Sequence, residues 1–544
     1  MNSFQGEGVS GGITLGNIFI FKHTDNKIEK KVVEDYKPEI ERFSAACEQA
    51  ISQLQALSED SVSKVGEEAA QIFMIHSMMI EDDDYQDFVI NKIKGESVSA
   101  EYAVFSAIDF LTEFLNESGV AYIEERKSDI MDITNRIISI LRSDVEPLNQ
   151  FNGPVILAAE DLTPSQTVQL ERDKILSIVT KYGTNNSHTA ILSRTMGIPS
   201  IVGLEDIYDD SLNGRQAVVD ADNGVVIIEP DEQTLDMYQK KIKESKFEQQ
   251  QYLDEIGKET VTTKGRKIKL YANIGDLSEV NLVKKNDAEG IGLFRSEFIF
   301  LGRKKLPSED EQLEVYRSVA ESLNGAEVII RTLDIGADKQ VDYLDLPEED
   351  NPALGLRAVR LCFERTEIFK TQLRALYRAS AFGSISIMFP MIISVEEIIK
   401  IKDLIKEVCL ELDKDGFDYN HDVKIGIMIE TPAAAIISAD LAEEADFFSI
   451  GTNDLSQYTL ALDRQNPRLT SYAEPHHKAV LDLIKLTAEN AHKKGIWVGV
   501  CGEMAADLEL TDFFIESGID ELSVAPPKVL PLRKRIRESG SIFM

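Results

Sequence analysis

The sequence predicts an α/β multidomain protein, in which a small α/β domain with an inserted helical bundle precedes a C-terminal (β/α)8 barrel. Three observations lead to this fold class. The chain has 544 residues, more than one hydrophobic core usually supports, so about two to four domains are expected. One long segment shows helical spacing with almost no glycine, and the second half alternates short apolar runs with amphipathic helices.

Strand-like segments on both sides of the helical block predict a small α/β domain made of residues 1–27 and 144–230. Between them, residues 28–143 repeat apolar side chains such as Phe43, Cys47 and Leu54 at helical intervals, the pattern of a bundle core. A helical domain inserted into the α/β domain explains this order.

The second half of the chain predicts a connecting helix and a barrel. Residues 231–258 are charged, lack proline and space their few apolar residues helically. Residues 259–544 contain eight short apolar runs separated by amphipathic helices, which matches a (β/α)8 barrel of the TIM type in number and length. The runs are 268–273, 290–294, 328–330, 386–389, 425–429, 447–450, 497–500 and 522–524.

The composition limits the kinds of binding partner and the cell compartment that we expect for this protein. Acidic side chains outnumber basic ones 94 to 58, and the formal charge of −36 would repel nucleic acid and anionic membranes, so a basic protein partner fits better. Four scattered cysteines form no disulfide framework or paired zinc pattern, which predicts a reducing cytoplasm. No run reaches the ~18 apolar residues of a membrane span, and no export signal starts the chain, so membrane insertion is not expected.

Polar residues directly follow several of the apolar runs of the predicted barrel. Because the carboxyl ends of barrel strands face one cavity, we expect these side chains to converge there. Any one of them alone is as well explained by a strand cap or an ion pair. They are Arg295, Arg331, Glu430, Asn453, Asp454 and Cys501.

The types of these residues indicate anion and metal binding. Arginines suit a phosphate and a carboxylate because the guanidinium offers paired donors, and Lys339 would add a point charge. Glu430 and Asp454 are hard oxygen ligands of the kind that Mg²⁺ prefers. Cys501 could donate a proton, although a small buried hydrophobe is the commoner role for cysteine.

A histidine loop precedes a predicted helix at residues 182–192. Asn186 or Ser187 can cap that helix, so His188 would lie beside free backbone amides, where a phosphoryl group is favourable. Neutral imidazole is an available nucleophile at cellular pH. A lone histidine is usually structural. The loop by itself therefore does not decide between a structural histidine and one that carries a phosphoryl group.

Two other histidine positions are less informative. His76 lies on a predicted helix just before an acidic run and could line a partner-binding face, although such a run is usually only solvated. His476 and His477 indicate a surface loop, because neighbouring carboxylates are not spaced in the sequence as metal ligands.

Seven ordered segments carry a resemblance over nearly the whole chain. They are AEDLTPS at 159–165, GIGLFRSEF at 290–298, IRTLDIG at 330–336, IMFPMI at 387–392, ETPAAA at 430–435, SIGTNDL at 449–455 and CGEM at 501–504. With these segments the chain resembles the Enzyme I family of the bacterial phosphoenolpyruvate:sugar phosphotransferase system.

The resemblance implies a transferase that moves the phosphoryl group of phosphoenolpyruvate to His188, leaving pyruvate, and then to the carrier HPr. This transfer would be the first step of sugar uptake by the phosphotransferase system, and the enzyme would be cytoplasmic. The α/β domain would be a swivelling phosphohistidine domain, the helical insertion would dock HPr, and the barrel would form a homodimer. Cys501 would be the proton donor, and Glu430 and Asp454 would hold Mg²⁺. Phosphoenolpyruvate would be held by Arg295, Arg331, Asn453, Asp454 and Arg464, with Lys339 assisting.

The chain departs from the family in the histidine loop, where two glycines, arginine, threonine and serine commonly precede the histidine. Thr184, Asn185 and Asn186 replace three of them here, and we expect this to change the orientation of His188 and the rate more than the chemistry. One alternative is therefore a catalytically weak HPr-binding scaffold. Another is a dikinase-like enzyme of phosphoenolpyruvate and pyruvate, which would need a separate nucleotide-binding subunit because no glycine-rich phosphate loop is present.

Overall fold

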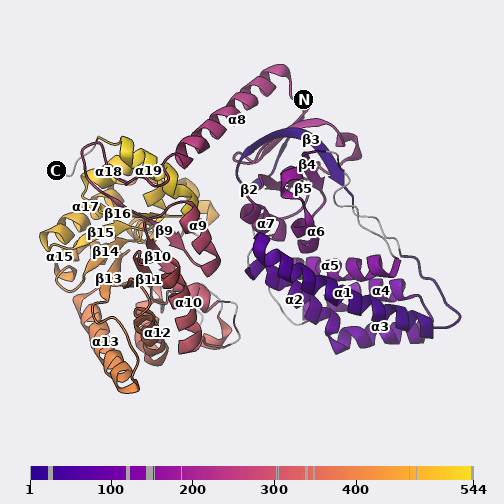
Figure 1. Cartoon of the computed structure of the whole chain (residues 1–544), viewed down its shortest axis with the longest axis horizontal. Helices are drawn as coiled ribbons and strands as arrows, with labels where there is room; N and C mark the ends of the chain where they lie inside the picture. The colour runs from indigo at the N-terminus through magenta and orange to yellow at the C-terminus, as the bar shows by residue number, and fades with distance from the viewer. Residues whose placement is uncertain are drawn as a thin grey trace. The chain divides into compact units, whose positions relative to one another are not determined.

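In its computed structural model the chain folds into two compact units, Met1–Glu248 and Gln249–Met544 (Figure 1). Within the described ranges, every helix is too short or too polar to cross a membrane. The structure describes residues 2–22, 28–65, 67–117, 123–142, 151, 153–185, 187–301, 303, 305–336, 341–346, 349–464, 466–472 and 474–540.

A mixed sheet forms the α/β domain of the first unit. Its strands lie in the order β1-β8-β7-β3-β4-β5-β6-β2. The strands β3, β4, β5 and β6 pair in parallel, whereas β7 runs antiparallel to β3. The bounds are β1 Asn2–Gln5, β2 Glu7–Ser10, β3 Ile13–Phe21, β4 Val155–Ala159, β5 Ile175–Thr180, β6 Ser200–Val202, β7 Gln216–Asp220 and β8 Val225–Ile228, with helices α6 Pro164–Gln169 and α7 His188–Met196.

Strand β4 is buried on both faces. Ile156 and Ala158 belong to one apolar cluster and Leu157 and Ala159 to another, because successive side chains of a strand point to opposite faces. Met196 of α7 packs against the second cluster, so α7 covers that face of the sheet.

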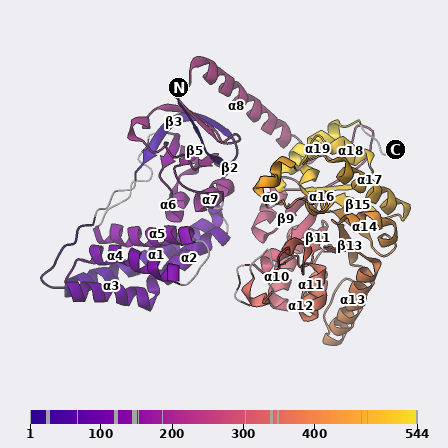
Figure 2. The same ribbon diagram turned by 180° about the vertical axis from the view of Figure 1, so that it is seen from behind.

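The inserted bundle lies between β3 and β4 in the chain and beside the sheet in space (Figure 2). Phe43, Phe73 and Val104 are fully buried in its core, and Leu192 of α7 belongs to the same apolar cluster. The predicted helical insertion is therefore confirmed. Its helices are α1 Lys37–Val65, α2 Glu67–Glu81, α3 Asp83–Glu96, α4 Ala100–Glu117 and α5 Ile123–Arg142.

The helix α8 (Glu232–Leu253) lies within the predicted connecting segment. Its Tyr238 packs against Val218 and Ile227 of the sheet. Residues 243–250 of the same helix are exposed. The start of α8 is therefore part of the first unit.

The second unit contains a closed barrel of parallel strands, which confirms the predicted fold class. Each of the eight predicted runs coincides with one strand to within about two residues, as boundary assignments normally do. The strands are β9 Lys269–Ile274, β10 Ile291–Arg295, β11 Val328–Arg331, β12 Ile385–Phe389, β13 Lys424–Ile429, β14 Phe447–Ile450, β15 Trp497–Val500 and β16 Glu521–Val524. The helices are α9 Val280–Lys285, α10 Glu309–Ser322, α11 Val359–Glu364, α12 Thr366–Ala379, α13 Val395–Asp415, α14 Pro432–Ile436, α15 Ser438–Leu441, α16 Thr452–Leu460, α17 Lys478–Lys493, α18 Thr511–Glu516 and α19 Val529–Glu538.

Apolar side chains fill the barrel interior, so it is a packed core rather than a channel. Cys501, directly after β15, belongs to this interior cluster. The other buried members are Tyr271, Leu293, Ile329, Met388, Met428 and Phe447.

Candidate active site

Two arginines end neighbouring strands of the barrel in register with each other. Arg295 ends β10 and Arg331 ends β11. The Arg331 side chain is buried, and its guanidinium lies 2.7 Å from Glu297 and 2.9 Å from Asp334. Because a buried cation is costly without partners, these two carboxylates make the position of Arg331 possible. Arg295 is half-buried and lies over the ring of Phe298, 5.2 Å from its centroid.

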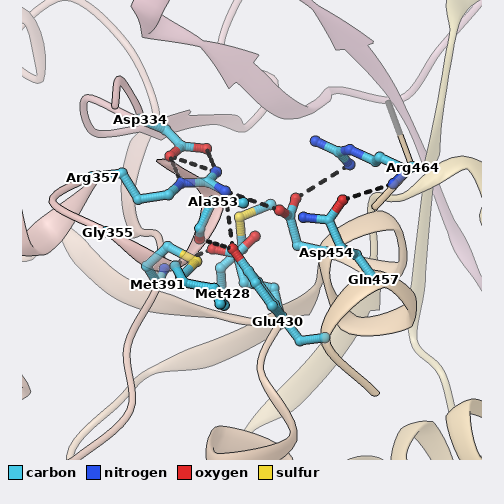
Figure 3. Close-up of polar contacts among 12 residues, drawn as sticks. Asp334, Ala353, Gly355, Arg357, Met391, Met428, Glu430, Asp454, Gln457 and Arg464 are labelled. Carbon is cyan, nitrogen blue, oxygen red and sulfur yellow. Dashed lines mark hydrogen bonds and ion pairs between the residues drawn. The ribbon is translucent and has the colours of Figure 1, made fainter. Parts of the chain in front are cut away.

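A further arginine, Arg357, belongs to the site although its place in the sequence does not indicate it. Its guanidinium donates to both oxygens of Asp334 at 2.9 and 3.0 Å and to Asp454 at 3.2 Å (Figure 3). Arg357 precedes α11 and follows no strand, so strand-end reasoning could not find it. The available signal was a charged residue in the long segment between β11 and β12.

Asp334 therefore orients two guanidinium groups at once. One of its oxygens contacts Arg331 and both contact Arg357, while only 3% of the residue is exposed. Paired charged hydrogen bonds of this kind fix both distance and direction. The cationic side of the site is thus held rigidly before any anion binds.

Glu430 directly follows β13, and Asp454 lies in the first turn of α16, after the adjacent strand β14 (Figure 3). Glu430 is fully buried and its Oε1 accepts a 2.6 Å hydrogen bond from the backbone N–H of Met391. Its Oε2 has no hydrogen-bond partner among the described residues. Burial, followed by the charges of Asp454 and Asp334, raises the pKa of Glu430. A buried carboxylate oxygen without a partner fits a divalent cation with oxygen ligands, so these residues suit Mg²⁺.

Asp454 also contacts Arg464, whose guanidinium lies 3.4 Å from its second oxygen. The backbone N–H of Arg464 donates to Gln457 at 3.1 Å, which ties this exposed residue to α16. Asn453 accepts from the backbone N–H of Glu503 at 2.9 Å, so α16 is joined to the loop that follows Cys501. Lys339 lies outside the described residues.

Cys501 lies at the end of β15 with only 4% of its surface exposed. Its sulfur lies 3.8 Å from the backbone oxygen of Ile450. Burial raises the pKa of the Cys501 thiol to about 12. The sulfur therefore keeps its proton at neutral pH, as a proton donor must and as a nucleophilic cysteine would not.

The histidine loop leads into α7, whose first residue is His188. Ser187 is the cap, with its hydroxyl accepting from the N–H of Ala190 at 3.4 Å. Gly183 has φ +118°, a conformation that favours glycine. The side chain of His188 and all of Asn186 lie outside the described part of the chain. Ser187 takes up the N–H of Ala190, and the other amide groups of the first turn of α7 have no partner within the helix, which suits an anion.

Arg194 holds this loop against the helix that follows it. Its guanidinium donates to the side-chain oxygen of Asn185 at 2.6 Å and to the backbone oxygen of the same residue at 2.8 Å. A weaker bond of 3.4 Å reaches the backbone of Val9. Asn185 is one of the residues that depart from the family pattern, so the altered loop has an anchor of its own.

Of the two remaining histidine predictions, that for His76 was wrong, whereas His476 and His477 do lie in a loop, before α17. His76 is fully buried between Asp129 and Asp132, and so it cannot line an exposed face. His476 does have acidic neighbours, because Asp507 lies 2.6 Å away and Glu509 is close by. These carboxylates come from the loop after β15, which sequence spacing could not indicate.

Three family models match successive parts of the chain. The N-terminal part of PEP-utilising enzymes matches residues 5–126, and their mobile domain matches residues 151–224. Their PEP-binding domain matches residues 248–540. The last of these covers the barrel and the barrel site.

Curated relatives are similar to this chain over nearly its full length. The phosphoenolpyruvate-protein phosphotransferase of Priestia megaterium is 39% identical over 98% of this chain and 93% of that protein. The protein of the same name from Bacillus subtilis (strain 168) is 39% identical over 98% of this chain and 94% of its own length. That of Haemophilus influenzae is 40% identical over 97% and 92% respectively.

Proposed function

Because the chain belongs to the phosphoenolpyruvate-protein phosphotransferase family, we propose that His188 carries a phosphoryl group from phosphoenolpyruvate to the carrier HPr. The protein is an enzyme of phosphoenolpyruvate-dependent phosphotransfer. The observation that supports the substrate site best is the linked set Arg331, Asp334, Arg357 and Asp454 at the mouth of the barrel. It offers fixed guanidinium groups to an anion and carboxylates to a cation.

Phosphoenolpyruvate carries a phosphate and a carboxylate, and each needs its own donors. We assign these to Arg295, Arg331 and Arg464, with the amide of Asn453 nearby and Lys339 assisting. Mg²⁺ would be held by Glu430 and Asp454, and it would neutralise charge on the bound substrate. The free Oε2 of Glu430 supports this assignment.

In the first half-reaction the imidazole of His188 attacks phosphorus, and the bond from phosphorus to the enol oxygen breaks. The electron pair of that bond leaves with enolpyruvate as an enolate. Cys501 then gives its thiol proton to the enolate carbon, which produces pyruvate. The raised pKa of Cys501 supports this role because the thiol is protonated when it is needed.

The second half-reaction transfers the phosphoryl group from His188 to HPr. The face of α2 supports a docking role, because Met74 and Met78 are 57% and 67% exposed there. The chain next to this face is acidic, with Asp83 and Asp84 exposed at the start of α3. An apolar patch with an acidic rim fits a small basic protein.

The barrel is the proposed dimerisation domain. Phe298, Leu354 and Ile436 support this role, because they leave 47%, 64% and 64% of their surface exposed on its loops and helices. The cytoplasm is the proposed location. The free cysteines Cys47, Cys362 and Cys501, all buried, support a reducing compartment.

The test of this function is mass spectrometry at neutral pH after incubation with phosphoenolpyruvate and Mg²⁺. One phosphoryl group on His188 is expected, with an equal amount of pyruvate, and the group should move to HPr when HPr is added. A His188→Ala variant that still transfers phosphate would overturn the assignment. HPr binding without phosphorylation would instead favour a scaffold.

A further inference from the structure

A buried polar cluster joins the inserted bundle to the α/β domain. His76 of α2 is fully buried, and its Nε2 is hydrogen-bonded to Asp129 of α5 at 3.2 Å. Its Nδ1 lies 3.5 Å from Asp132 of the same helix but has no hydrogen-bond partner among the described residues. The two aspartates are 3% and 6% exposed. Burying such groups is costly, and apolar residues would usually hold two helices together at least as well. The cluster therefore calls for a role beyond the packing of α2 on α5.

The second contact of Asp132 leaves the bundle. Its Oδ2, the atom near His76, also accepts from the backbone N–H of Ser165 at 3.4 Å. Ser165 lies in α6 of the α/β domain and is itself buried. One carboxylate thus connects α2, α5 and α6.

The segment just before Ser165 is hydrogen-bonded to α7, the helix that begins at His188. The hydroxyl of Thr189 donates to the backbone oxygen of Leu162 at 3.2 Å. The helix α7 also makes an apolar contact with the bundle. Its Leu192 is 4% exposed and belongs to the apolar core of the bundle. The helix α7 is therefore attached to the bundle by two independent contacts.

The same helix α2 carries the proposed docking face on its other side. Met74 and Met78 are each two positions from His76, which is about 200° around an α-helix. Their side chains are exposed while His76 is buried. The helix thus presents one face to solvent and holds the α/β domain, through α5, with the other.

We propose that Asp132, which lies beside the buried His76, is a positioning residue that aligns α7, and with it His188, to the docking face for transfer to the protein acceptor. The proposal rests on the proposed function. The alignment concerns only the bundle and the α/β domain, whereas phosphorylation by phosphoenolpyruvate uses the α/β domain and the barrel. Loss of Asp132 should therefore affect one half-reaction and spare the other.

The test compares Asp132→Ala, Asp132→Asn and Met78→Ala in the full-length protein. Three quantities are measured for each: the rate of phosphorylation by phosphoenolpyruvate, the dissociation constant for purified HPr, and the single-turnover transfer rate at saturating HPr. Asp132→Ala should lower only the transfer rate, by about tenfold or more, because small misalignments are costly in transfer steps. Asp132→Asn keeps an oxygen acceptor for Ser165 and should restore most of that rate. Met78→Ala should have the opposite effect: the dissociation constant for HPr should rise, whereas the transfer rate at saturating HPr should not change.

Other outcomes have definite meanings. A wild-type transfer rate in Asp132→Ala overturns the proposal, as does an equal loss in both half-reactions, which would indicate a merely structural aspartate. If Asp132→Ala does not fold, Leu192→Ala tests the apolar contact and must show the same selective loss of transfer. Failure of the wild type to phosphorylate HPr would instead refute the proposed function.

Discussion

Arg357 and Asp454 form an ion pair of 3.2 Å between residues 97 positions apart in the chain. The other oxygen of Asp454 faces Arg464 at 3.4 Å. The carboxylate proposed as a metal ligand is therefore shared with two guanidinium groups. The binding of a cation and the position of the arginines are coupled at this residue, because each contact draws on the same negative charge.

Arg357 should be needed for use of phosphoenolpyruvate. Arg357→Lys keeps the charge but loses the planar fork that grips Asp334, so we expect kcat/KM for phosphoenolpyruvate to fall about 100-fold. Steady-state pyruvate release at several phosphoenolpyruvate concentrations measures this. Arg317→Lys is the control, because its guanidinium pairs with Glu321 on the surface of α10. Equal kinetics in the two variants would remove Arg357 from the site.

The Cys501 thiol should stay protonated from pH 6 to 9. Its pKa is raised from 9.0 to about 12 by burial, so the neutral thiol is the dominant form throughout that range. We expect iodoacetamide to modify the half-buried Cys409 well before Cys501, and both to react once the protein is unfolded. Peptide mapping at timed intervals gives the rates. Fast alkylation of Cys501 in the folded protein would contradict a protonated donor.

Arg194 should set the rate at which His188 is phosphorylated. Its paired contacts fix the residue three positions before the histidine, so Arg194→Ala should slow phosphorylation by about tenfold, with Arg194→Lys in between. Quench-flow with labelled phosphoenolpyruvate measures the rate. Arg172→Ala is the matched control, because Arg172 binds the backbone oxygens of Met196 and Gly197 at the other end of α7. A similar loss in both variants would point to general loosening of the helix.

Glu521 should make the barrel less stable as the pH rises. Burial raises the pKa of Glu521 well above its usual value, while Lys269 opposes and Glu327 adds to the shift. The folded state then binds more protons than the unfolded state above pH ~4.3, so stability is present below that pH and is lost as the pH rises toward the folded pKa. Glu521→Gln removes this loss, which amounts to at most about 1.4 kcal/mol per pH unit.

Urea unfolding at pH 5, 6 and 7 tests the Glu521 prediction. The advantage of Glu521→Gln over the wild type should grow with pH. Glu489→Gln, at an exposed position of α17, should show no such trend. A constant difference between Glu521→Gln and the wild type would mean that Glu521 is ionised in the folded barrel.

Several features of the site could be read from local sequence. Arg331, Glu430 and Cys501 each follow an apolar run directly, and parallel strands bring their carboxyl ends to one side of a barrel. Ser187 caps α7 because a serine hydroxyl can bond to an amide three residues on. These features depend on spacing along one element, and spacing is visible in the sequence.

Other features needed the fold. The sequence alone determined the order of helices and strands, the barrel and the strand-end residues, because periodicity and chain direction are local properties. Only the tertiary structure decided that His76 faces inward, that His476 meets Asp507, and that Arg357 reaches Asp454. These outcomes depend on which side chains from distant segments share a low-dielectric space, where a charge must find a partner. No periodic pattern along the chain specifies that partner.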